Sequence, residues 1–309
     1  MLKGLHMKWK VKYGIQRVLS LLPWGAGRYL NHSLAVRFGN LRNFKFYEIS
    51  HTLAMVQHLR SLGFEARGKT FVELGTGWSS ASPMILIGMG AGQVYSFDLY
   101  RHLEQKYIDA AQAALRDVAK YLDPNYPFVV DLKAEAAQID FSRIELNKFH
   151  YSAPHDATRT KLPDNSVDCY YSVAVLEHIP KLVVANLLRE SLRILKPGGY
   201  CFHYVQPTMH AAYFDKRATG IDYLTCSDME WHLLYDNDIA HESRLRGVEY
   251  VQLLKDSGFD LIGEWHTVDE KAMSALPRKR LAQRFQNYTP EEICTDYIWI
   301  IGRKALISA

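Results

Sequence analysis

Short apolar segments typical of strands alternate with amphipathic segments typical of helices from about residue 70 to residue 301. The strand patterns lie at Thr70–Leu74, Gln93–Asp98, Phe149–Ser152, Val167–Val173, Tyr200–Val205, Asp260–His266 and Asp296–Ile301. The clearest helical patterns lie at Leu103–Tyr121, Lys181–Leu195 and Val248–Ser257. This alternation predicts an α/β fold with a doubly wound, mostly parallel sheet of seven strands. The last two strands have no clear crossover pattern between them, so we expect an antiparallel hairpin at the sheet edge.

Two segments lie outside this alternation, a helical lead-in over residues 1–69 and a cap-like insertion at about residues 208–246. We therefore divide the chain into the lead-in and an α/β domain of residues 70–309 that carries the insertion. Through Tyr47 the lead-in holds nine lysines and arginines and no acidic residue. Interleaved apolar residues allow two interpretations, an amphipathic helix on an anionic membrane surface or a basic helix packed on the core. No nucleic-acid partner is expected, because no recognised reader motif accompanies the charge.

The composition is ordinary for a soluble globular protein, with 48% hydrophobic and 23% charged residues. The chain has no run of about 18 apolar residues that would predict a transmembrane helix. Its N-terminus lacks the apolar stretch and cleavage site of a secretory signal. The four cysteines are far apart and form no CxxC pair. We therefore expect a cytoplasmic protein with buried free thiols and no metal site.

The segment from Phe71 to Ser80 reads FVELGTGWSS, an apolar strand that runs into a glycine turn and then a helix. Gly75 and Gly77 permit positive φ and let a ligand approach the backbone closely. The amides at the following helix start suit a polar or anionic group. The third glycine of a GxGxxG motif is missing, with Ser80 in its place, and an ordinary strand-to-helix turn would show the same pattern.

The next strand ends in Asp98, 21 residues after Gly77. An acid at this position can accept hydrogen bonds from ribose hydroxyls, as in dinucleotide folds. A turn or the start of a helix would use the same residue type. Together the glycine loop and Asp98 favour an adenosine-containing ligand, without distinguishing NAD from S-adenosylmethionine.

Four spaced motifs narrow this choice: Asp156-Ala157, LPDNSVD at 162–168, VLEHIP at 175–180 and LRILKPGG at 192–199. Their order and spacing resemble class I S-adenosylmethionine-dependent methyltransferases of the methyltransferase-domain type, over about residues 70–205. The flanking segments resemble a bacterial subgroup of this family. The resemblance implies a Rossmann-like fold, S-adenosyl-L-methionine as cofactor, and methylation of an oxygen or nitrogen of a small acceptor. Whatever the function, Lys196–Gly199 is expected to end a helix and turn the chain.

The resemblance also implies a set of cofactor-binding residues. They are Glu73, Gly75, Thr76 and Gly77 at the methionine and ribose side, Asp98 with Leu99 beside it at the ribose hydroxyls, and Asp156 with Ala157 beside it at the adenine amino group. Trp78 departs from the commonest form of the glycine loop. It either shapes the methionine end of the site or serves as a hydrophobic plug.

Transfer from a sulfonium is an in-line displacement that positioning accelerates, and a hydroxyl acceptor also needs a base that titrates near neutral pH. His178, just after a strand, is the first candidate for this base; its alternative role is to fix the cofactor floor through the loop backbone. His210 is a weaker candidate, as is His241, whereas His203 lies within a strand and is interpreted as a core residue. Relatives are expected to carry acidic residues after the fifth strand, but this chain reads QPTMH at 206–210.

The insertion combines aromatic residues with arginines, which suits a polar or anionic acceptor such as a sugar or a phosphorylated intermediate. Tyr223, Trp231 and Arg244 are its candidate substrate residues, and a helical flap that packs on the core is the alternative interpretation. Two other functions stay open. An NAD-dependent oxidoreductase would share the glycine loop and Asp98, and an inactive methyltransferase-like scaffold would need no catalytic group.

Overall fold

In the computed structural model, the residues described are 9–23, 26–27, 29–31, 46–128, 130–213 and 215–306. Their centre is a seven-stranded sheet with the order β3-β2-β1-β4-β5-β7-β6. The strands are β1 (Thr70–Leu74), β2 (Gln93–Phe97), β3 (Phe149–Ser152), β4 (Val167–Val173), β5 (Leu195–Val205), β6 (Asp260–Val268) and β7 (Thr295–Arg303). β7 runs antiparallel to both of its neighbours, and the other pairs are parallel. The predicted sheet with its antiparallel edge pair is confirmed.

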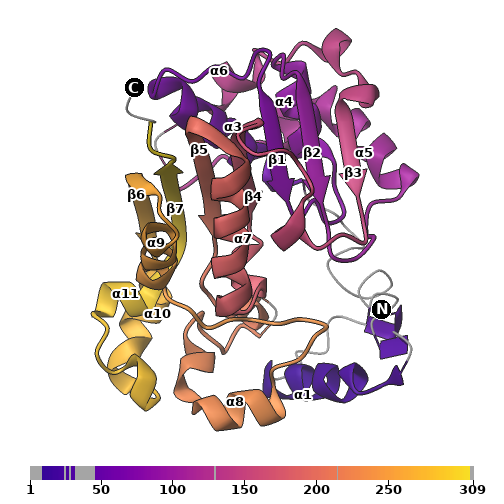
Figure 1. The fold of residues 1–309 in the computed structure, drawn as a ribbon. Coiled ribbons are helices and arrows are strands. Elements are labelled where there is room, and N and C mark those ends of the chain that lie inside the picture. Colours follow the sequence, from indigo (N-terminus) through magenta and orange to yellow (C-terminus); the bar gives the residue numbers. More distant parts are fainter. Residues whose placement is uncertain are drawn as a thin grey trace.

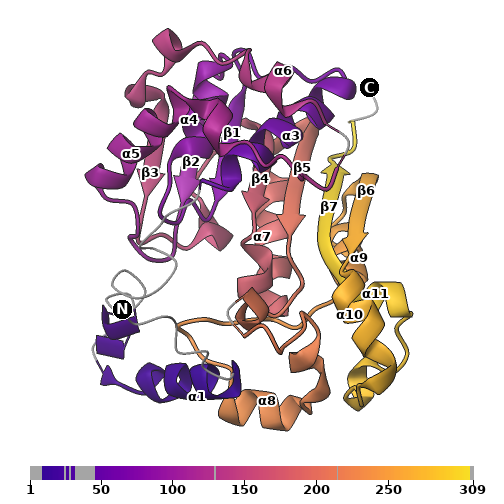
Figure 2. The same ribbon diagram turned by 180° about the vertical axis from the view of Figure 1, so that it is seen from behind.

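Helices cover both faces of the sheet, as Figure 1 and Figure 2 show from opposite sides. One face is covered by α3 (Glu48–Ser61), α4 (Ala81–Gly88), α5 (Gln105–Leu115) and α6 (Leu132–Ala136), the other by α7 (Lys181–Ile194) and α9 (Gly247–Asp256). Successive strand residues point to opposite faces. Phe71 therefore packs in the first core cluster and Val72 in the second. The four cysteines are buried and free, as predicted.

Lys196–Gly199 does not end a helix as expected, because α7 already ends at Ile194. The segment lies within β5, where Leu195 pairs with Val167 and Tyr200 pairs with Cys169. Four residues of β5 thus stand opposite one residue of β4, and a bulge takes up the difference. Gly198 has a φ of 78° there, a conformation that favours glycine.

The predicted helix over Leu103–Tyr121 is also shorter than expected. α5 ends at Leu115, and a 3-10 turn over Val118–Tyr121 follows. Asp117 separates the two with a φ of −133°, which is outside the helical region.

Residues 208–246, here called the cap, lie at the carboxyl ends of the parallel strands (Figure 1). They contain the short helices η8 (His210–Tyr213), η9 (Asp222–Thr225) and α8 (Asp228–Leu234). The N-terminal helix α1 (Trp9–Ser20) lies beside α8 in both views. A third core cluster joins α1 and the cap to α10 (Glu270–Ala275) and α11 (Pro290–Cys294).

The described part of α1 packs against the cap, with Trp9 and Tyr13 buried among cap residues. This packing agrees with the interpretation of a basic helix held on the protein, and the membrane interpretation stays open for its other face. The basic residues Lys3, Lys8, Arg28, Arg37, Arg42 and Lys45 lie outside the described residues. No described helix is long and apolar enough to cross a membrane.

Candidate cofactor and acceptor site

The strand order reverses between β1 and β4, so the loops that follow these two strands meet at the carboxyl edge of the sheet. Open α/β sheets bind their ligands at such a switch point. Gly75, directly after β1, touches Val175 in the loop after β4: a Cβ built on Gly75 would lie 2.7 Å from Val175 Cγ2. Gly75 also has a φ of 74°. Both its conformation and the close contact therefore require glycine.

Asp98 connects the glycine loop to the neighbouring strands. The Gly77 N–H donates a hydrogen bond to Asp98 Oδ2 at 2.9 Å, and the Tyr151 hydroxyl donates to the same oxygen at 3.4 Å. Burial raises the pKa of Asp98 to about 6. Leu99, the next residue, is 59% exposed and stands free beside the loop. Asp98 and Leu99 thus place a fixed carboxylate next to an exposed apolar side chain.

Glu73 lies beneath the glycine loop, inside the sheet. It accepts hydrogen bonds from the Ser96 hydroxyl at 2.7 Å and from the Tyr171 hydroxyl at 3.1 Å. Burial raises its pKa to about 7. These contacts give Glu73 a role in joining β1 to β2 and β4 under the site.

The remaining residues of the expected cofactor set surround the same edge. Thr76 is buried in the glycine loop. Asp156 begins a 3-10 turn that contains the buried Ala157, and its Oδ1 accepts from the Thr158 N–H and hydroxyl. The turn is tied to the end of β2 because the His155 N–H donates to the Asp98 carbonyl at 2.8 Å. Apart from Glu73 in β1, the loops after β1, β2 and β3 thus carry the set, whose role in cofactor binding stays a prediction.

Trp78 packs against aromatic residues that follow β2. Its ring lies 4.6 Å from that of His102 and 5.6 Å from that of Tyr107, measured between centroids. Of the two interpretations of Trp78, this packing favours the hydrophobic plug.

Buried acidic side chains lie along the carboxyl edge of the sheet. Two of them, Glu48 and Glu177, are not among the site residues expected from the sequence. Burial raises the pKa of Glu48 to about 7 and that of Glu177 to about 8. Neither carboxylate forms a hydrogen bond of ordinary geometry through its side-chain oxygens within the described residues. The Tyr47 hydroxyl is close enough to Glu48, Glu73 and Glu177 for their charges to raise its pKa. The three acids therefore all lie near Tyr47, and no lysine or arginine of the described residues is among the groups that shift their pKa values.

His178 and His210 lie side by side on the acceptor side of this edge, with ring centroids 4.7 Å apart. His178 belongs to a 3-10 turn after β4, and His210 begins η8 after β5. Burial lowers the pKa of both imidazoles, which favours their neutral form. His178 Nδ1 is 2.8 Å from the His241 carbonyl. His203 is buried in β5 between Ser172 and Cys201, as expected of a core histidine.

The three candidate substrate residues of the cap are buried in its own core. The Tyr223 hydroxyl donates to the Pro207 carbonyl at 3.1 Å. Trp231 packs between aromatic rings of α1 and the cap. The guanidinium of Arg244 donates to the carbonyls of Tyr223 and Cys226, and pairs with Asp228. These contacts hold the cap together, and a direct contact of the three with substrate stays a prediction.

Comparison with known proteins agrees with the geometry. Residues 72–203 match the model of the methyltransferase domain family. This segment, which is less than half of the chain, is a class I S-adenosylmethionine-dependent methyltransferase domain with S-adenosylmethionine as its cofactor. No curated protein matches the chain.

Solved structures of low identity also match. A magnesium protoporphyrin IX methyltransferase from Synechocystis, with bound S-adenosylhomocysteine, is 13% identical with a TM-score of 0.49, over 90% of this chain and 99% of that one. A chain from a Haloferax volcanii complex of the Trm112 methyltransferase activator with a methyltransferase is 17% identical with a TM-score of 0.49, over 91% and 99%. An S-adenosylmethionine-dependent methyltransferase from Mesorhizobium loti is 16% identical with a TM-score of 0.42, over 80% and 96%.

The two glycines of the loop allow a matched test of the switch-point contact. Gly75→Ala should destabilise the protein by about 2–4 kcal/mol, because positive φ and the clash with Val175 add up. Gly77→Ala should cost about 1–2 kcal/mol, because Gly77 has a φ of 62° but open space around its missing Cβ. Urea unfolding of both variants measures the difference. Equal losses would mean that the contact with Val175 does not constrain the loop.

Proposed function

We propose that this protein transfers the methyl group of S-adenosylmethionine to an oxygen or nitrogen of a small polar acceptor. The observation that carries the proposal is the convergence of two sets of groups at one switch point. The glycine loop and Asp98 lie on the cofactor side, and the neutral imidazoles of His178 and His210 lie on the acceptor side. A histidine base would also suit an NAD-dependent oxidoreductase, and the match of residues 72–203 to the methyltransferase domain family is what favours methyl transfer.

The charge of the edge fits the cofactor. S-adenosylmethionine carries two cationic groups, a sulfonium and an ammonium. Glu48 and Glu73 are buried acids whose pKa values lie near 7, and no cationic side chain of the described residues is among the groups that lower them. Cationic groups bound nearby would stabilise their ionised forms. We assign Asp98 to the ribose hydroxyls and Glu48 to the cationic end of the cofactor.

When bound, S-adenosylmethionine supplies a methyl group whose carbon–sulfur bond breaks as the acceptor atom bonds to the carbon. The protein's own residues align the acceptor and receive its proton. An imidazole that is neutral at pH 7 can accept that proton. His178 is the better placed of the two, because its Nδ1 is fixed against the His241 carbonyl and its Nε2 is left available.

The acceptor is proposed to enter between the loop after β4 and the cap. His210 and Tyr213 of η8 border this entrance, with ring centroids 6.0 Å apart, and Tyr213 is 50% exposed. The guanidinium of Arg244 already binds carbonyl groups inside the cap. We therefore assign acceptor recognition to the uncharged polar groups at the entrance, those of His210 and Tyr213. A sugar-like acceptor fits these groups, and a phosphorylated one has less support.

Asp98→Asn tests the cofactor assignment. The variant should bind S-adenosylhomocysteine about tenfold or more weakly at pH 7.5, because a charge-assisted hydrogen bond contributes about 1.5–3 kcal/mol. In the native protein the affinity should also fall as the pH drops through about 6, because protonation removes the acceptor carboxylate. In the Asp98→Asn variant, the loss of affinity that is due to protonation of Asp98 should be absent.

Isothermal titration calorimetry measures both effects, with Asp109→Asn as the control because Asp109 is an exposed acid on α5. Unchanged affinity in Asp98→Asn would remove Asp98 from the cofactor site. If the folded native protein bound no S-adenosylhomocysteine, the hypothesis of an inactive scaffold would replace that of an enzyme.

We also propose that α1 attaches the protein to an anionic membrane surface. While Trp9 and Tyr13 are buried against the cap, Val11, Ile15 and Val18 are 50%, 45% and 64% exposed at helical spacing. Arg17 lies in the same helix between Ile15 and Val18 and would complement anionic headgroups, whereas Lys10 pairs with Glu230 of the cap.

The double variant Ile15→Glu/Val18→Glu should abolish co-sedimentation with vesicles that contain phosphatidylglycerol, since it removes apolar area and adds negative charge. It should leave the melting temperature unchanged, because both side chains are exposed. Ile262→Glu, at an exposed position on β6, is the control. Equal sedimentation of the double variant and the native protein would contradict the membrane contact.

A further inference from the structure

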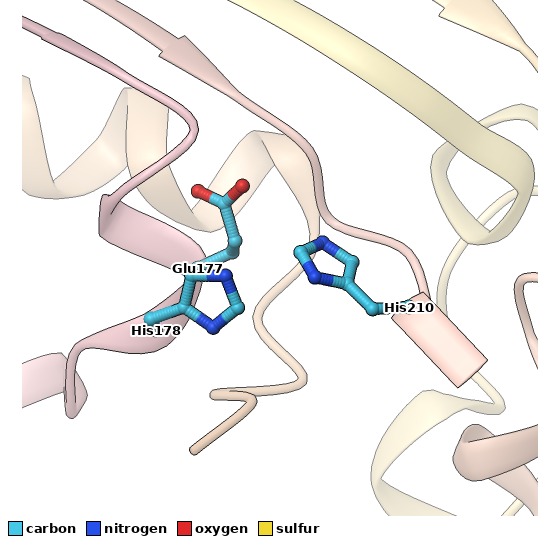
Figure 3. A group of neighbouring side chains, drawn as sticks. All are labelled: Glu177, His178 and His210. Atoms are coloured by element: carbon cyan, nitrogen blue, oxygen red, sulfur yellow. The ribbon is translucent and has the colours of Figure 1, made fainter. Parts of the chain in front are cut away.

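Glu177, His178 and His210 come together from two neighbouring strand ends. Glu177 and His178 are consecutive in the turn after β4, and His210 follows β5. Each side chain has one donor atom that lies within 4.8 Å of the donors of the other two. Figure 3 shows the carboxylate and the two rings gathered between these segments. An ion with bonds of about 2.0–2.2 Å holds its donors roughly 3–4 Å apart, so small side-chain rotations suffice to close the set.

Glu177 and His210 carry buried polar atoms that no described residue satisfies. Glu177 is 4% exposed, and among the described residues neither of its side-chain oxygens has a hydrogen-bond partner of ordinary geometry, although the backbone of Glu177 and Gln206 is close enough to lower its pKa. The Nε2 of His210 is also buried and without a partner. Burying a carboxylate without compensation costs several kcal/mol. Such a group at the mouth of a ligand crevice indicates a cation that belongs there.

His178, the third residue of the group, is oriented in the way that metal-bound histidines commonly are. His178 Nδ1 lies 2.8 Å from the His241 carbonyl oxygen. A carbonyl only accepts, so Nδ1 carries the hydrogen and Nε2 keeps its lone pair. A backbone carbonyl that fixes the tautomer in this way is the usual outer partner of a histidine ligand. The backbone of His210 is held similarly, because its N–H donates to Glu242 Oε1 at 3.1 Å.

We propose that Glu177, His178 and His210 bind a divalent transition-metal ion, in contrast to the expectation from the sequence that the chain has no metal site. Two imidazole nitrogens and one carboxylate oxygen are the donors that Zn²⁺, Fe²⁺ and Co²⁺ prefer, whereas Mg²⁺ and Ca²⁺ prefer oxygen. Three protein ligands leave coordination positions open for a further molecule.

The ion would determine which acceptors the enzyme takes, an extension that rests on the proposed function. With its Nε2 bound to the ion, His178 would hold the metal instead of serving as the base, and the acceptor hydroxyl on the ion would release its proton to water. Positive charge beside an acceptor hydroxyl lowers the pKa of that hydroxyl. An acceptor with two neighbouring oxygen donors, such as a vicinal diol or a hydroxy acid, would occupy two open positions. The proposed substrate class is therefore a small chelating hydroxyl compound.

Cobalt titration of the metal-free full-length protein tests the site directly. We expect one equivalent of Co²⁺ to bind, with a visible absorption spectrum of histidine and carboxylate coordination, and Zn²⁺ to displace it. Glu177→Gln and His210→Ala should each weaken Co²⁺ binding at least tenfold. His266→Ala, which removes an exposed histidine on β6, should bind Co²⁺ as the native protein does.

Melting temperatures and S-adenosylhomocysteine affinities of the same variants separate the possible failures. Folded variants that keep their cofactor affinity but lose Co²⁺ support the site. Absence of stoichiometric Co²⁺ binding in a native protein that binds S-adenosylhomocysteine would overturn the metal site and leave the methyltransferase intact. Co²⁺ binding that both variants retain would mean adventitious binding elsewhere and would overturn it as well.

Discussion

The contact between Gly75 and Val175 is the constraint on which the site depends. It brings the loop after β1 against the loop after β4, at the point where the strand order reverses. Apart from Glu48 in α3 and Glu73 in β1, the groups attributed to the cofactor follow β1, β2 and β3 on one side of this contact. The acceptor groups follow β4 and β5 on the other side. A side chain at residue 75 would push these loops apart and separate the two halves of the reaction.

Burial gives the edge its chemical character. Carboxylates with raised pKa values destabilise a folded protein when they ionise without a partner. This chain keeps Glu48, Glu73 and Glu177 there, close enough to influence a common tyrosine. A cationic cofactor and a metal ion would each supply the missing counter-charge. These buried acids thus lower the stability of the fold and make this edge complementary to cations, as is common at ligand sites.

Much of the fold was predictable from local patterns, because buried strands and glycine turns leave strong signals in the chain. β1, β2 and β4 and the loop around Gly75 lie where the sequence indicates them, whereas β5 begins at Leu195, five residues before the predicted strand. The bulge at Lys196–Gly199 was not predictable, since its pairing with β4 depends on tertiary register. Neither Glu48 nor the partners of Arg244 could be found from spacing alone, because they depend on how distant segments pack. Glu177 stood inside a recognised motif, and its adjacency to His178 was the signal that could have marked it.

The cap and α1 pack together outside the sheet. Their aromatic core joins segments more than 200 residues apart, including Trp9 and Tyr235. The residues that first suggested an acceptor pocket, Tyr223, Trp231 and Arg244, therefore hold the cap together.

Hydrogen exchange with and without S-adenosylhomocysteine tests the central claim, that the cofactor binds at the β1–β4 switch point. The account predicts slower amide exchange on ligand addition in residues 75–79, 98–100 and 155–158, with the outer strand β6 unchanged. Protection confined to other segments, or no protection despite measured binding, would contradict it.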